Sequence, residues 1–424
     1  MSFRARLARL SEGGPSTAAR EALLDDLRGR MRRVLERTAP PRPPPEVASE
    51  DPDCVLPFFA EETERGVRHR RVRRLSVAHR TGRAPARAAK DVDCTLLSLL
   101  ALDPALASVD FGRALYLDTE TTGLSGGTGT VAFLVGLATF GSAEGGTTWA
   151  DRGLFVEQLL VRTLGEEVPM LAYVRERIEA ASAIVTFNGK AFDMPLLRTR
   201  FAMNRFPPPP DRPHLDLLHV ARRVHGRKCK LTALEERVLG FVREDDVPSG
   251  EVSGRYLHFL RTGNESALLG VVEHNLQDVI SMAALVGLYG SNDATDLAAE
   301  DLVGVARTLK RAGSLDRAFD VANAARDRGA GLEALRARAA IARARGDRDR
   351  ALADLETLLA EVDCPSARLD LAKLYEHHVK DAARALDLVG QGVAEPAPAV
   401  EKRRSRLTRK AQRQRQAGLF VRKG

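Results

Sequence analysis

The 424-residue chain is long enough for two or three domains, each with a hydrophobic core of its own. Its composition, 44% hydrophobic and 29% charged, is that of a globular protein, and no apolar run approaches the roughly 20 residues that a membrane helix requires. The first residues include several arginines but lack the apolar stretch of a secretory signal. We therefore expect a cytoplasmic protein with no membrane partner.

The net charge of +8 is concentrated in two segments. Residues 65–90 and residues 402–424 each carry ten Lys or Arg and no acid. Such density of positive charge is what neutralisation of nucleic-acid phosphates requires. A solvated or disordered charge run is the alternative interpretation.

The chain before residue 110 divides into two parts. Residues 1–54 contain an Arg-rich amphipathic stretch followed by a Pro run. The Pro run itself can be neither helix nor central strand. We expect residues 1–54 to form a flexible or helical N-terminal segment. Residues 55–109 are a basic lead-in segment in which a strand or two and a helix near 96–102 are predicted.

Residues 110–292 show the alternation of an α/β domain. Buried strands are predicted from the apolar runs at 114–118, 130–140, 155–161 and 183–189. Helices are predicted at 166–181, 193–206, 231–240 and 268–290. Three successive strands, then a helix, a strand and a helix, predict a mixed central sheet flanked by helices.

From about residue 300 the chain is rich in Ala, Leu and Arg and repeats internally. The segments 311–319, 343–352 and 378–386 align at steps of 33 and 34 residues, with Ala318, Ala351 and Ala385 in register. This period resembles that of tetratricopeptide repeats, in which helix pairs stack. Residues 300–396 are therefore predicted to form an all-α repeat domain, open to a protein partner, and residues 397–424 a basic C-terminal tail.

A pair of acids follows the first strand of the α/β domain. In LDTETTGL, Asp118 and Glu120 stand two residues apart, so both side chains point to the same face of the strand. Carboxylates held together repel each other unless a cation lies between them, and Mg²⁺ or Mn²⁺ prefers such oxygen ligands. Taken alone, two ordinary surface acids are the alternative.

Two further motifs supply acids. In FNGKAFD, Asp193 stands at the head of a helix, with Asn188 in the preceding strand-to-helix loop. In HNLQD, His274 and Asp278 are one helical turn apart and share a face. An exposed helix pair is the alternative interpretation of His274 and Asp278.

Together the three motifs resemble those of the DEDD exonuclease superfamily, and blocks from about 110 to 290 resemble the YprB-type ribonuclease H-like family. The resemblance implies a metal-dependent 3′–5′ exonuclease that hydrolyses phosphodiester bonds of DNA or RNA with two Mg²⁺ or Mn²⁺ ions. It also implies that the metal ligands are Asp118, Glu120, Asp193 and Asp278. His274 would be the general base, although only three residues separate it from Asp278, a spacing at which the superfamily usually has a tyrosine.

Other residues near the motifs are candidates for substrate binding, namely Thr121, Thr122, Asn188 and Lys190. For Lys190 a solvated surface position is the alternative. Asp216 is a possible extra acid, but a helix-capping role is favoured.

Two other functions are compatible with the same pattern. One is a catalytically weak or inactive nucleic-acid-binding or scaffold protein that uses the repeats and the basic segments. The other is removal of a nucleotide from a small substrate on the same fold. The presence of all four acids argues against an inactive domain.

Overall fold

The computed structural model describes residues 55–76, 78–123, 129–142, 152–226, 229–291 and 297–421. The N-terminal segment 1–54 and most of the Gly-rich turn after Thr122 lie outside the described residues. The described chain divides into two compact units. The smaller contains Leu56 and Pro248–Leu268, with helix α8 (Val252–Thr262) and the turn Glu265–Leu268, where Leu56 N donates to Glu265 Oε2 at 2.5 Å.

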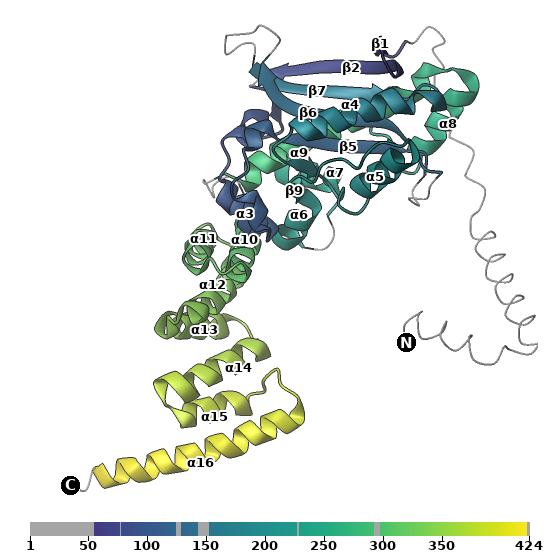
Figure 1. Ribbon diagram of the computed structural model, residues 1–424. Helices are drawn as coiled ribbons and strands as arrows, with labels where there is room; N and C mark the ends of the chain where they lie inside the picture. Colours follow the sequence, from purple (N-terminus) through teal and green to yellow (C-terminus); the bar gives the residue numbers. More distant parts are fainter. Residues whose placement is uncertain are drawn as a thin grey trace, which may run out of the picture. The chain divides into compact units, whose positions relative to one another are not determined.

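The larger unit is built on a seven-stranded mixed sheet with the strand order β1-β2-β7-β6-β5-β8-β9 (Figure 1). The strands are β1 (Phe59–Thr63), β2 (Gly66–Ser76), β5 (Leu115–Thr121), β6 (Ala132–Ser142), β7 (Arg152–Leu160), β8 (Ile184–Thr186) and β9 (His214–Asp216). Neighbours from β1 to β5 are antiparallel, whereas β5, β8 and β9 are parallel. The predicted mixed sheet flanked by helices is confirmed.

Two helices cover opposite faces of this sheet, α4 (Glu167–Ala180) and α9 (Leu269–Tyr289). On β7, Gln158 donates to the Val272 carbonyl of α9 at 2.7 Å, whereas the adjacent Glu157 bonds Tyr173 of α4. Because successive side chains of a strand point to opposite faces, the two helices lie on opposite sides of β7. The sheet is therefore buried on both faces, which explains its continuous apolar runs.

Shorter elements complete the α/β unit. They are β3 (Arg80–Thr81), β4 (Ala84–Pro85), the 3₁₀ turns Ala86–Lys90, Pro104–Leu106, Phe111–Arg113 and Leu164–Glu166, and helices α3 (Cys94–Ala101), α5 (Asp193–Met203), α6 (Leu217–His225) and α7 (Leu231–Leu234). A π-helical turn, Glu235–Leu239, continues α7. Such turns are rare and often occur at functional sites.

The predicted lead-in segment belongs to the sheet, because β2 pairs antiparallel with β7 along eight residues from His69 to Ser76. The arginines of β2 are largely paired with carboxylates of the chain itself. Arg68 and Arg70 bond Glu61, and Arg71 bonds Glu273 at 2.9 Å. The high density of arginine in β2 therefore has a structural explanation that composition alone did not reveal.

The C-terminal part is all helical, as predicted. Its helices are α10 (Ala299–Arg311), α11 (Leu315–Asp327), α12 (Gly331–Arg345), α13 (Arg348–Glu361), α14 (Pro365–Leu374), the π-helical turn Tyr375–Val379, α15 (Ala382–Gly390) and α16 (Ala397–Val421). Each helix packs against the next in the chain. The three alanines predicted to be in register, Ala318, Ala351 and Ala385, are fully buried. The assignment to tetratricopeptide repeats stays a prediction.

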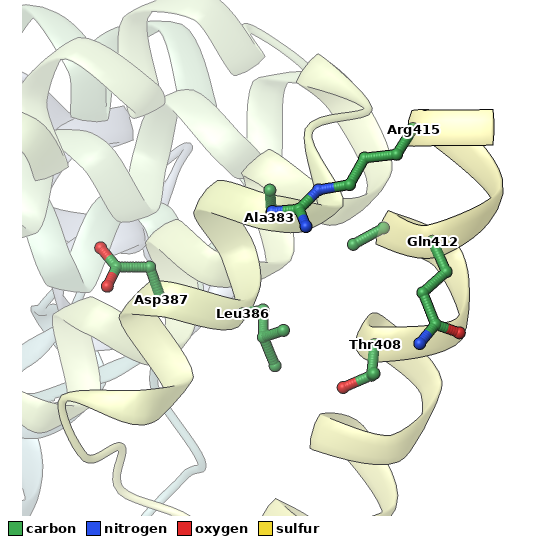
Figure 2. Close-up of a pocket in the computed structure, with 7 residues that line it drawn as sticks. Ala383, Leu386, Asp387, Thr408, Gln412 and Arg415 are labelled. Carbon is green, nitrogen blue, oxygen red and sulfur yellow. The ribbon is translucent and has the colours of Figure 1, made fainter. Parts of the chain in front are cut away.

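The long helix α16 makes up most of the predicted basic tail. A cavity of about 360 Å³ lies between α15 and α16, and Figure 2 shows Leu386 and Asp387 on one side and Thr408, Gln412 and Arg415 on the other. No helix in the described part of the chain is long and apolar enough to cross a membrane.

Candidate active site

Strand β5 carries the first two acids in the middle of the sheet. Leu115, Tyr116 and Leu117 are fully buried, and Asp118 and Glu120, opposite Gly136 and Leu134 of β6, are partly exposed. Burial raises the pKa of Asp118 well above its usual range, and the charges of Asp278, Glu120 and Asp193 raise it further. The acids of all three motifs are therefore close enough to repel one another.

The third acid, Asp193, is the first residue of α5 and is itself buried. The hydroxyl of Thr119, between the two acids of β5, donates to Asp193 Oδ1 at 2.5 Å and ties the head of α5 to β5. Burial raises the pKa of Asp193 to about 6, although the bond from Thr119 acts in the opposite direction. For Glu120, burial and the neighbouring acids raise the pKa to about 7, against the effect of His274.

The loop before α5 is held by a buried carboxylate. Asp216 accepts from the backbone N–H of Asn188 at 2.8 Å and of Lys190 at 3.1 Å, and it also caps α6 through Leu218 N. The predicted capping role of Asp216 is confirmed. Asn188 has φ +70°, a left-handed conformation that Asn tolerates better than most residues, so its identity has a backbone reason.

Helix α9 brings the remaining predicted residues to the site. His274 Nε2 lies 4.0 Å from Glu120 Oε1 and 3.7 Å from Asp278 Oδ2. Burial opposes protonation of the imidazole, but the charges of Asp278 and Glu120 prevail, and the pKa of His274 is raised. The shortened His-x3-Asp spacing thus still places histidine between two of the acids.

Asn275 of α9 was not predicted. It is fully buried and donates from Nδ2 to Asp118 Oδ2 at 2.9 Å, while its Oδ1 accepts from Gln158 at 3.0 Å. Its contact with the sheet requires Gly136, since a Cβ built there would lie 2.4 Å from Asn275 Oδ1. The position of Asn275 next to His274 in HNLQD was an available signal, but the glycine that makes room for it stands on another strand.

A basic residue that sequence reasoning missed also reaches the site. Arg243 forms a two-pronged bond with Glu235, through Nε at 2.7 Å and Nη2 at 2.6 Å, and both side chains are almost fully buried. Its Nη2 also bonds Asp278 Oδ1. Asp246, on the same loop, bonds His274 Nδ1 at 2.6 Å. The π-helical turn and the loop after it therefore hold His274 and Asp278, the two predicted site residues of α9.

The four predicted substrate-binding residues occupy different environments. Thr122 closes the turn between β5 and β6, because its hydroxyl accepts from Val131 N at 3.0 Å, and Thr121 donates to the Gly123 carbonyl at 3.0 Å. Lys190 Nζ lies 3.8 Å from Asp103 Oδ2 and is 40% exposed. Of these residues, Lys190 has the most freedom to contact a bound molecule.

The donor set suits a hard divalent cation. It consists of four carboxylates whose like charges make one another's ionisation costly, and such a cation prefers oxygen ligands of this type. In the described part of the chain, no three acidic, His or Cys side chains already stand in metal-holding geometry. Asp278 Oδ1 accepts a hydrogen bond from Arg243, so Oδ2 is the oxygen available to another partner.

Residues 115–289 match the family model described as RNase_H superfamily. This part of the chain is a ribonuclease H-like domain. It contains β5 to β9 and α9, and hence all four acids. The curated protein "Uncharacterized protein YprB" of Bacillus subtilis (strain 168) is 37% identical over 175 residues, which are 40% of this chain and 40% of the relative. The chain thus spans less than half of the relative's length.

Among solved structures, the family B DNA polymerase of Pyrobaculum calidifontis is 13% identical. The match covers 47% of this chain and 29% of the polymerase chain, with a TM-score of 0.31.

Proposed function

We propose that the chain is a DEDD-type 3′–5′ exonuclease that hydrolyses phosphodiester bonds with two divalent metal ions. The observation that carries the proposal is the convergence of Asp118, Glu120, Asp193 and Asp278 from β5, α5 and α9 on one site. Four carboxylates that repel one another destabilise a fold that serves only as a scaffold, whereas they are useful for holding cations.

The four carboxylates would hold Mg²⁺ or Mn²⁺. When bound, these ions activate water and stabilise the negative charge that develops on the phosphate and on the leaving 3′ oxygen. The chain contributes rigid placement. Asn275 fixes one oxygen of Asp118 at 2.9 Å, Thr119 fixes one oxygen of Asp193 at 2.5 Å, and Arg243 fixes one oxygen of Asp278.

His274 would accept the proton of the attacking water at Nε2. Its Nδ1 is bonded to Asp246 at 2.6 Å, which fixes the ring and leaves Nε2 on the side of Glu120 and Asp278. The raised pKa of His274 comes from those two acids, so neutralising them favours the neutral imidazole that a general base needs.

Thr121, Thr122, Asn188 and Lys190 would contact the terminal nucleotide. Lys190 is the best placed for a phosphate, because its ammonium group is half-exposed and its acid partner lies at 3.8 Å. The two threonines and Asn188 already use hydroxyl or backbone groups within the fold, so their contribution to binding would be mainly to shape.

The test is cleavage of single-stranded DNA and RNA labelled at the 3′ end, with Mg²⁺, Mn²⁺ or EDTA. We expect early loss of the label only with a divalent ion, and its abolition by Asp118→Asn. Asp211→Asn is the matched control, because this substitution makes the same chemical change at a side chain that is 95% exposed. Wild-type protein that leaves every strand intact with either ion, or activity that survives Asp118→Asn, would refute the proposal.

A further inference from the structure

The long helix α16 carries a row of cations on one face. Lys402, Arg406, Arg409 and Arg413 follow one another at intervals of four, three and four residues, which is the spacing of one helix face. With about 1.5 Å of rise per residue, the row spans roughly 16 Å. Lys402, Arg409 and Arg413 are exposed, and no carboxylate partner is recorded for them among the described residues.

Part of this row is held in place by a buried acid. Glu376, in the π-helical turn before α15, is almost fully buried and accepts from Arg406 at 2.8 and 2.9 Å and from Lys410 at 2.7 Å. Burial opposes ionisation of this carboxyl, but Arg406 and Lys410 prevail and lower its pKa to about 2. Glu376 is therefore always charged near neutrality, and it anchors α16.

The anchored cations keep part of their binding capacity. The Arg406 and Lys410 side chains are 43% and 42% exposed, and the recorded bonds of Arg406 use Nε and Nη2. The Nη1 group of Arg406 is left for a further acceptor. Side chains that are already ordered lose less entropy when they bind a ligand, so this arrangement favours binding of an anion.

Positive charge on α16 exceeds the acids that face it. Residues 402–415 contain eight Lys or Arg and no acid. The acids recorded as pairing with them are Glu376, Glu395 and Glu401. The surplus therefore points outward, in contrast to strand β2, whose arginines meet Glu61, Glu157 and Glu273.

We propose that this row, together with Lys410, is a binding face for the sugar-phosphate backbone of a nucleic acid. The choice of nucleic acid rests on the proposed function, since a phosphodiester polymer is then the substrate. A lipid surface fits less well. Leu407 and Ala411, the apolar side of the described part of α16, are buried in the protein, and insertion into lipid requires an exposed apolar face.

The side of α16 that faces α15 is a different one from the row. Thr408, Gln412 and Arg415 line the cavity shared with α15, so they lie on a different face from the row (Figure 2). The row is thus separate from the packing surface of the helix. Substitution of its unpaired members should leave the helix docked.

The test uses the full chain in EDTA, with fluorescence anisotropy of labelled 30-nucleotide single and double strands over a range of salt. The variant is Lys402→Gln/Arg409→Gln/Arg413→Gln. We expect affinity to fall about tenfold or more at low salt, and the slope of log K against log salt for duplex to become shallower by about 2 to 3. A control with the same charge change, Arg311→Gln/Arg348→Gln/Arg350→Gln, alters three exposed cations on α10 and α13 and should bind like wild type.

Equal affinity and slope for the row variant and wild type would overturn the proposal. So would an equal loss in the control, which would indicate net charge alone, or wild-type binding to phosphatidylserine vesicles but to neither strand. Failure of the proposed function is distinguishable: a chain that binds strands through α16 but cleaves none retains the binding face without the nuclease.

Discussion

Replacing Gly136 with alanine tests whether the contact between α9 and the sheet organises the acidic site. Gly136 stands opposite Asp118 in the β5–β6 register. A Cβ at this position would lie 2.4 Å from Asn275 Oδ1 and 2.9 Å from its Cγ and Nδ2. Ordinary contacts to a Cβ begin near 3.4 Å, so the Asn275 amide must move by about 1 Å. Because Asn275 is fully buried, it has no open space into which to move.

The expected cost has two parts. Forcing an additional methyl group into a packed interior costs about 1 to 3 kcal/mol. Displacement of the Asn275 amide also weakens its bonds to Asp118 at 2.9 Å and Gln158 at 3.0 Å, and a hydrogen bond to a charged group contributes about 1.5 to 3 kcal/mol. Partial relaxation makes the sum an upper limit. We expect the free energy of unfolding to fall by about 2 to 5 kcal/mol.

The assay is urea denaturation followed by circular dichroism, together with the rate of metal-dependent cleavage on the folded variant. Gly141→Ala is the matched control on the same strand, because a Cβ there would meet only the Phe155 ring, at 3.7 and 3.8 Å. The control should change stability by less than about 1 kcal/mol. If Gly136→Ala is as stable and as active as Gly141→Ala, then Asn275 is not wedged between α9 and the sheet, and the reasoning fails.

Three further predictions concern the site itself. Arg243→Met leaves Glu235 buried without its partner and should lower the free energy of unfolding by about 3 to 5 kcal/mol, and Arg243→Met/Glu235→Leu should recover much of the loss in the same urea titration. Because the pKa of Glu120 is raised to about 7 and that of Asp193 to about 6, the folded protein holds protons that the unfolded chain releases near pH 4. The melting temperature in EDTA should therefore fall as pH rises from about 4.5 to 7.5, and Mg²⁺ should raise it most at the upper end; a flat profile contradicts the acid cluster. Lys190→Ala should raise KM for a short strand severalfold with little change in kcat or stability, as measured by steady-state cleavage, whereas a loss confined to kcat would exclude a role in binding.

Local patterns sufficed for the main elements of the sheet. The apolar runs at 114–118, 130–140 and 155–161 correspond to β5, β6 and β7, because strands buried on both faces have no alternation to obscure them. β9 was missed. It has only three residues, His214–Asp216, and runs directly into α6, so neither its length nor its periodicity separates it from a helix start.

The acids of the site were accessible to motif reasoning because each belongs to a short segment whose geometry is local. The residues that orient them were not. Arg243 reaches Asp278 across 35 residues, and Asn275 reaches Asp118 across 157. Such contacts depend on how a loop or helix docks, and no periodicity within a window of sequence reports it.

The two basic segments, residues 65–90 and 402–424, also show that tertiary contacts cannot be predicted from local sequence. By composition they are alike, with ten cations and no acid in each. The fold places Glu61, Glu157 and Glu273 around β2, so its arginines are consumed by structural ion pairs. Along α16 it places few acids, chiefly Glu376, and the remaining charge is left for a partner. The sequence therefore gives only the number of cationic side chains. Whether these side chains are available to bind phosphate depends on the acids that the tertiary structure places next to them.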